Sequence, residues 1–67
     1  MNLTHLAVFH AIATEGSVSR AADRLMVSQP AVSKQLRQLE RSLGGGPLFD
    51  RLPKGVRTTA AGELLAG

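Results

Sequence analysis

Apolar residues recur at helical spacing in the segment SQPAVSKQLRQLERSL, residues 28–43. Val32, Leu36, Leu39 and Leu43 follow one another at intervals of four, three and four residues, and this spacing places side chains on one face of an α-helix. Ser28 suits the N-cap position, because its hydroxyl can accept a hydrogen bond from an N–H of the first turn. A proline is tolerated in that first turn. The pattern therefore predicts a helix over residues 29–43 with one buried face.

A first helix is predicted from Leu3 to Thr14, ended by the Glu-Gly pair that follows it. Its expected core side consists of Leu3, Leu6, Phe9 and Ala13. Val8 and Ile12, four residues apart, lie off that side. The pattern leaves two interpretations of this pair open: ordinary surface residues, or a second apolar strip that another helix covers.

A second helix is predicted from Val18 to Leu25, with Ser17 as its cap. Ala22 lies near its centre, where a small side chain lets the helix of residues 29–43 come close. Only MVS, residues 26–28, separates the two helices, and so short a connection predicts a helix-turn-helix corner. We expect Val27 to fill the core at this turn. In such a corner the second helix is the outer one and has the right size for a DNA major groove.

The periodicity changes after residue 43. PLFDR and VRTT are short extended runs on either side of LPKG. In LPKG, Pro53 favours a turn and Gly55 adopts turn conformations at little steric cost. These features predict a β-hairpin, and Thr59 can cap a further helix begun by AAGELLAG. We therefore expect a mainly α winged helix-turn-helix over residues 1–58, with a three-helix core and a two-stranded β-hairpin wing. Residues 59–67 would be the start of this further helix, which the chain cuts off after about two turns.

The polar side of the helix over residues 29–43 is basic. At about 100° per residue, Lys34, Arg37 and Arg41 gather opposite the apolar stripe, and Pro30 and Ser33 lie beside them toward the N-terminal end. On one helix alone, this pattern also fits an ordinary solvated face. The alternative is a surface that binds an anion.

The distribution of charge favours an anionic partner. Six of the eight Lys and Arg residues lie between Lys34 and Arg57, where only Glu40 and Asp50 oppose them. The net charge is +3 and the sequence pI is about 10.7. This balance suits an anionic partner, although many small domains reach it by chance.

Composition excludes several other classes of protein. With no cysteine among 67 residues, disulfides and thiolate metal sites are excluded. No apolar run approaches a membrane span, and the start MNLTH has no signal-peptide pattern, so we expect a cytoplasmic protein without a membrane partner. His5 and His10 are five residues apart, which is not a metal-ligand spacing on a helix, and we expect both to be partly exposed. No pair of carboxylates suggests acid–base chemistry, and we predict that the chain is not an enzyme.

The string AADRLMVSQPAVSKQLRQLE, followed by LFDR, resembles the N-terminal DNA-binding domain of LysR-type transcriptional regulators. The resemblance covers essentially the whole chain. It implies a winged helix-turn-helix that binds interrupted palindromes in bacterial promoters, and a linker helix that pairs protomers. It also implies a downstream domain for a small-molecule effector, so no cofactor is expected in this fragment. A full-length regulator would be a homodimer or tetramer, and this fragment a weak dimer or monomer.

Carried over by position, the resemblance assigns DNA contacts to the recognition helix at Gln29, Pro30, Ser33 and Lys34, and to the wing tip at Lys54. The chemistry of these side chains agrees with the assignment. A glutamine amide can pair with adenine, a lysine can reach guanine or a phosphate, and a proline ring can touch a thymine methyl group. A serine suits either a base or a phosphate.

Arg37 and Arg51 complete the predicted DNA-binding set. Arg37 belongs to it as part of the basic helix face. Arg51 has two open roles, a contact to DNA or a structural brace for the wing. Two departures from the family pattern concern the wing: Gly44–Gly46 reads as an insertion, and Thr58 stands where an apolar residue is usual.

Two functions from different classes remain in view. The first is sequence-specific binding of double-stranded DNA, with residues 29–43 in the major groove and the wing, residues 48–58, on the flanking backbone or minor groove. The second is a winged-helix module that docks an acidic protein partner. Single-stranded DNA or RNA is a weak third alternative, because two Phe and no Tyr or Trp offer almost no stacking platform.

Overall fold

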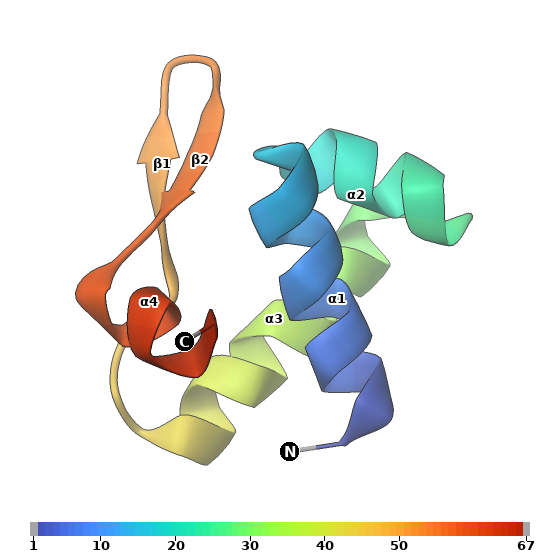
Figure 1. The fold of residues 1–67 in the computed structure, drawn as a ribbon. Coiled ribbons are helices and arrows are strands. Elements are labelled where there is room, and N and C mark those ends of the chain that lie inside the picture. Colours follow the sequence, from blue (N-terminus) through green and yellow to red (C-terminus); the bar gives the residue numbers. More distant parts are fainter. Residues whose placement is uncertain (1, 67) are drawn as a thin grey trace.

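Residues 2–66 are described by a computed structural model, in which helices α1, α2 and α3 form one unit and a hairpin stands beside it (Figure 1). The elements, in chain order, are α1 (Leu3–Glu15), α2 (Val18–Leu25), α3 (Gln29–Leu43), β1 (Phe49–Leu52), β2 (Gly55–Thr58) and α4 (Ala60–Ala66). The predicted mainly α arrangement with a two-stranded wing is confirmed.

The helices begin where local side chains satisfy first-turn N–H groups. The hydroxyl of Ser17 accepts a hydrogen bond from the Arg20 N–H at 3.2 Å, and that of Ser28 accepts one from the Ala31 N–H at 3.2 Å. Thr59 caps α4 in the same way through the Gly62 N–H. These short-range bonds explain why the predicted starts of α2, α3 and α4 are correct.

The buried face of α1 is not the predicted one. Leu3 and Leu6 are 85% and 40% exposed, Ala13 is also exposed, and of the predicted core side only Phe9 is buried. Two apolar stripes at helical spacing overlap on α1, the predicted one and a second one that contains Val8 and Ile12. Helices α2 and α3 cover the second stripe. The buried residues of α1 are His5, Val8, Phe9, Ala11 and Ile12.

This outcome also settles the open question about Val8 and Ile12. Both are buried, and they belong to a core cluster with Ala21 and Ala22 of α2 and Val32 of α3. Ala22 is 2% exposed, so the expected close approach of helices at this position is confirmed.

His5 is buried as well, contrary to the expectation of partial exposure. Its Nε2 lies 3.4 Å from Oε1 of Gln38 on α3, and the residue is 9% exposed. His10 is exposed as predicted. His5 thus connects the N-terminal half of α1 to the polar side of α3.

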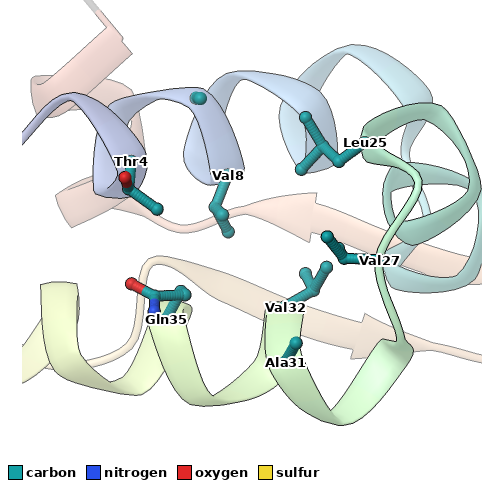
Figure 2. Close-up of a pocket in the computed structure, with 8 residues that line it drawn as sticks. Thr4, Val8, Leu25, Val27, Ala31, Val32 and Gln35 are labelled. Carbon is teal, nitrogen blue, oxygen red and sulfur yellow. The ribbon is translucent and has the colours of Figure 1, made fainter.

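The prediction that Val27 fills the core at the turn is wrong. Its side chain is 48% exposed and points from the turn toward the space between α1 and α3, near Leu25 and Val32 (Figure 2). This space is an open apolar cavity of about 290 Å³. Val27 therefore lines the cavity and does not fill the core, because the corner between α1 and α3 stays open at this end.

The hairpin is antiparallel and shorter at its start than expected. Phe49 pairs with Thr58 and Leu52 with Gly55. Pro47 and Leu48 lie outside the ladder because their polar groups have other partners. The Leu48 N–H donates to Oε2 of Glu40 at 2.7 Å, its carbonyl accepts from the Thr59 N–H at 3.0 Å, and the Pro47 carbonyl accepts from the Thr59 hydroxyl at 2.6 Å.

Two apolar contacts and one backbone bond attach the wing to the helices. Leu48 is 1% exposed in a cluster with Phe9 and Leu39, and the rings of Phe9 and Phe49 lie 5.3 Å apart between centroids. Near the tip, the Val56 N–H donates to the Gly16 carbonyl at 2.9 Å. The three glycines at 44–46 are therefore followed by a well-anchored segment, which fixes the wing against α1 and α3.

Candidate nucleic-acid interface

Helix α3 presents one face to the core and the opposite face to solvent. Val32 and Leu39 are fully buried, and Lys34, Arg37 and Arg41 are exposed on the other side. The predicted basic face is thus present, and it projects from the helix-turn-helix corner, where α1 and α2 do not cover it.

The N-terminal end of α3 carries the smaller predicted contact residues. Gln29 and Pro30 are exposed in the first turn, and Ser33 is half-buried one turn later. Because residues three and four apart are neighbours on a helix, Ser33 lies between Gln29 and Arg37 on the side that faces the wing. The structure therefore brings the predicted contact residues of α3 onto one continuous surface.

The hairpin register decides which wing residues face α3. Arg51 pairs with Val56, and Asp50 pairs with Arg57. Since side chains alternate between the two faces of a strand, Arg51 shares a face with Phe49, and Arg57 lies on the other face opposite an acid. Arg51 consequently joins the α3 surface, whereas Arg57 does not.

A cleft of about 240 Å³ separates α3 from this face of the wing. Its apolar floor includes Leu36 and Phe49, and Ser33, Arg37 and Arg51 contribute polar groups to its lining. The cleft thus lies between α3, which is predicted to enter the major groove, and the wing, which is predicted to contact the flanking backbone or minor groove.

Lys54 occupies the exposed turn of the hairpin, away from the α3 face. It lines a second cleft together with Gly16 and Arg20, at the corner between α1 and α2. The position of the tip is fixed by Gly55, whose φ is +119° and whose Cα approaches the Gly16 carbonyl so closely that no Cβ would fit. Lys54 is therefore a separate basic point beside Arg20, a residue that sequence analysis did not single out.

The bases of this surface are not neutralised within the molecule. Among residues 2–66, the only salt bridge joins Arg24 of α2 to Glu15 of α1, at 3.3 Å. Glu40, the acid closest in sequence to Arg37 and Arg41, directs its carboxylate to the Leu48 N–H. The α3 and wing cations therefore keep their charge available for an anionic ligand.

A further contact that sequence analysis missed lies at the start of α3. Nε2 of Gln29 donates to Oγ of Ser19 on α2 at 3.4 Å. The two residues are ten positions apart on different helices, and no short-range spacing signals such a pair. Only the angle of the helix-turn-helix corner brings them together.

Other site types find no support in the described part of the chain. Within residues 2–66, no group of three His, Asp or Glu side chains is arranged to hold a metal ion. None of the helices described there is long and apolar enough to cross a membrane.

Comparison with known proteins identifies close relatives of the whole domain. The family model of bacterial regulatory helix-turn-helix proteins of the lysR family matches residues 3–63. A probable RuBisCO transcriptional regulator of Trichormus variabilis is 56% identical over 63 residues, which cover 94% of this chain and 18% of that protein. The small neutral protease regulatory protein of Streptomyces coelicolor is 46% identical over 67 residues, which cover 100% of this chain and 20% of that protein.

Solved structures agree with these relatives. The CbnR DNA-binding domain in complex with DNA superposes with a TM-score of 0.89 at 40% identity, covering 97% of this chain and 74% of that one. The BenM DNA-binding domain in complex with catB site 1 DNA gives a TM-score of 0.88 at 40% identity, covering 97% of this chain and 72% of that one.

Proposed function

The chain belongs to the lysR family of bacterial regulatory helix-turn-helix proteins and is a DNA-binding domain of that family; from this premise, we propose how its residues divide the work of binding. We infer that the N-terminal half of α3 enters the major groove of double-stranded DNA and reads base pairs there. The observation that carries this proposal is the exposed, uncovered face of α3, on which Gln29, Pro30 and Lys34 lie together. A helix of this kind fits the width of a major groove.

The side chains of α3 have distinct roles in this proposal. Gln29 pairs its amide with an adenine, and Pro30 packs its ring against a thymine methyl group. Lys34 reaches guanine or a phosphate. Ser33, half-buried beside the cleft, hydrogen-bonds to a base edge or to the adjacent backbone.

The wing, residues 48–58, has a positioning role. With α3 in the major groove and the hairpin on the neighbouring minor groove, the backbone strand between the two grooves crosses the cleft that Arg37 and Arg51 line. We assign both arginines to that strand. Lys54 at the tip contacts phosphate or a narrow minor groove.

The remaining assignments extend beyond the domain itself. The chain spans 18% and 20% of two regulators that it resembles, which supports a longer protein. In that protein, residues 1–58 would bind DNA and residues 59–67 would begin a linker helix that pairs protomers. We expect a cytoplasmic homodimer or tetramer with an effector-binding domain, acting at an interrupted palindromic operator.

The roles of Gln29 and Lys54 can be separated by a salt titration. The preferred site is first selected from random duplex DNA, and binding is then measured on that site and on a scrambled duplex. Gln29→Ala should lose ~1–3 kcal/mol on the preferred site only, with an unchanged salt slope. Lys54→Ala should weaken both duplexes equally and make the slope of log affinity against log salt shallower by roughly 0.9.

Arg57 provides a matched control for Lys54, because it is an exposed wing cation opposite Asp50 and on the face away from α3. Arg57→Ala should change the salt slope less than Lys54→Ala does. Loss of specificity in Lys54→Ala, with loss of only salt dependence in Gln29→Ala, would reverse the two roles. Duplex binding that does not weaken with salt would contradict the proposal and favour docking to an acidic protein.

A further inference from the structure

The side chain of Gln29 is connected to the helix that precedes it. Its Nε2 donates to Oγ of Ser19 at 3.4 Å, across the turn of the helix-turn-helix. Ser19 is the second residue of α2, and both side chains are exposed. The bond therefore joins the proposed base-reading amide to the scaffold on the outer surface of the domain.

We propose that Ser19 is a positioning residue for Gln29 and that it sets the base specificity of α3. This proposal rests on the proposed function, in which Gln29 reads an adenine. Ser19 acts by restricting the Gln29 side chain, before DNA binds, to the rotamers that keep its amide beside the Ser19 hydroxyl.

The hydrogen-bond inventory of the amide supports this role. A glutamine amide has two N–H donors and one carbonyl acceptor, and Ser19 occupies one donor. One donor and the carbonyl remain free, and these are the two groups that adenine requires at its N7 and N6 positions. Because the Ser19 hydroxyl can either accept from the amide N–H or donate to the amide carbonyl, the bond fixes the place of the amide and leaves two of its hydrogen-bonding groups directed outward.

The Ser19 hydroxyl is well placed to act as a fixed reference. Helix α2 is held in the core by Val18, Ala21 and Ala22, and the start of α3 is capped by Ser28. The nearby hydroxyl of Ser17 is already committed to the Arg20 N–H. An exposed glutamine otherwise samples many rotamers. A rigid partner therefore reduces the side-chain conformational entropy that is lost when DNA binds.

The test is a double-mutant cycle on the 67-residue chain, with affinity measured on the selected duplex and on its scrambled control. Ser19→Ala should reduce the ratio of the two affinities roughly three- to ten-fold, the loss expected for one hydrogen bond. It should leave scrambled-duplex binding and the salt slope unchanged. In the Gln29→Ala background, Ser19→Ala should have no further effect.

Two further variants separate positioning from structure. Ser19→Thr retains the hydroxyl and should keep the ratio of the two affinities at its wild-type value. Ser42→Ala removes an exposed serine near the C-terminal end of α3 and should leave the ratio unchanged. Melting temperatures of all variants report whether the fold itself is altered.

The possible failures are distinguishable. If Gln29→Ala narrows the ratio but Ser19→Ala does not, the inference about Ser19 is wrong and the proposed function stands. If Ser19→Ala weakens both duplexes equally, with the same loss in the Gln29→Ala background, Ser19 contacts the DNA backbone independently and the inference is also wrong. If Gln29→Ala leaves the ratio unchanged, base reading by Gln29 and its positioning by Ser19 are both contradicted.

Discussion

One residue at the helix-turn-helix corner, Met26, has a conformational free-energy cost that burial of its side chain does not offset. Met26 adopts φ 60° and ψ 41°, and among residues 2–66 it is the only non-glycine residue with a positive φ. Its side chain is 90% exposed, so it gains little from burial. The left-handed conformation lets the Met26 and Val27 N–H groups bond back to α2, and this closes the turn that directs α3 outward.

Met26→Gly should therefore stabilise the domain. A left-handed non-glycine residue costs about 1–2 kcal/mol, and the added freedom of glycine in the unfolded chain takes back about 0.4–1 kcal/mol. We expect a net gain of about 0.5–1 kcal/mol in the free energy of unfolding, measured by urea denaturation. Val27→Gly, at the neighbouring position without a positive φ, should instead destabilise. A loss of stability in Met26→Gly would mean that this exposed side chain makes contacts that matter.

At the scale of elements, one short segment connects α3, the wing and α4. The backbone of Pro47 and Leu48 is hydrogen-bonded to Glu40 on one side and to Thr59 on the other. Gly62 of α4 is buried against it, and a Cβ there would lie 2.3 Å from the Leu48 carbonyl oxygen and 2.5 Å from Cγ2 of Thr58. The angle between α4 and the wing is thus set by direct backbone contact.

Gly62→Ala should disrupt this junction. Because the added methyl group meets backbone, which cannot move aside cheaply, we expect a loss of roughly 1–3 kcal/mol in the free energy of unfolding. Gly45→Ala is the matched control, since its Cβ would meet only Cβ of Ala61 at 3.9 Å and its φ is not positive. Thermal melting of both variants makes the comparison. Equal melting temperatures for the two would show that α4 does not pack as described.

At the scale of the whole molecule, basic and apolar surfaces are separated. The α3 face and the wing carry the unpaired cations described above, whereas the two most exposed leucines, Leu3 and Leu64, lie on α1 and α4 and are 85% and 84% exposed. Leu43 of α3 and Leu52 of the wing are less exposed, at 43% and 41%. Val8 and Ile12, for which the sequence pattern left surface exposure open, are buried in the core. Pairing of protomers through α4 stays a prediction, which the exposed side chain of Leu64 supports.

We predict that the 67-residue chain is a monomer or a weak dimer at micromolar concentration. The described part of α4 has seven residues, and Leu64 with the half-buried Leu65 offers little area compared with the roughly 1,000 Å² of a stable interface. Sedimentation equilibrium measures the association constant. Leu64→Glu should abolish any residual dimer, and a tight dimer that persists in this variant would contradict pairing through α4.

Much of this protein could be predicted from its sequence, because the responsible interactions are local. Ser17, Ser28 and Thr59 each accept a bond from an N–H three residues ahead, and a cap of this kind is visible in any window of a few residues. The stripe of Val32 and Leu39 defined the buried face of α3, and the bases opposite it defined the candidate binding surface. The Pro-Lys-Gly sequence of the turn likewise located the hairpin.

Only the tertiary structure decided features that depend on how elements meet. On α1, two apolar stripes satisfied the same helical spacing, and the positions of α2 and α3 determined that Val8 and Ile12 would be buried and that Leu3 would be exposed. The start of the hairpin shifted because Leu48 bonds to Glu40 and Thr59. The pair of Ser19 and Gln29 exists because the angle of the corner brings two helices together. Local sequence determines the secondary-structure propensity and the caps of each element. Contacts between distant residues form only when all elements pack together into the arrangement of lowest free energy.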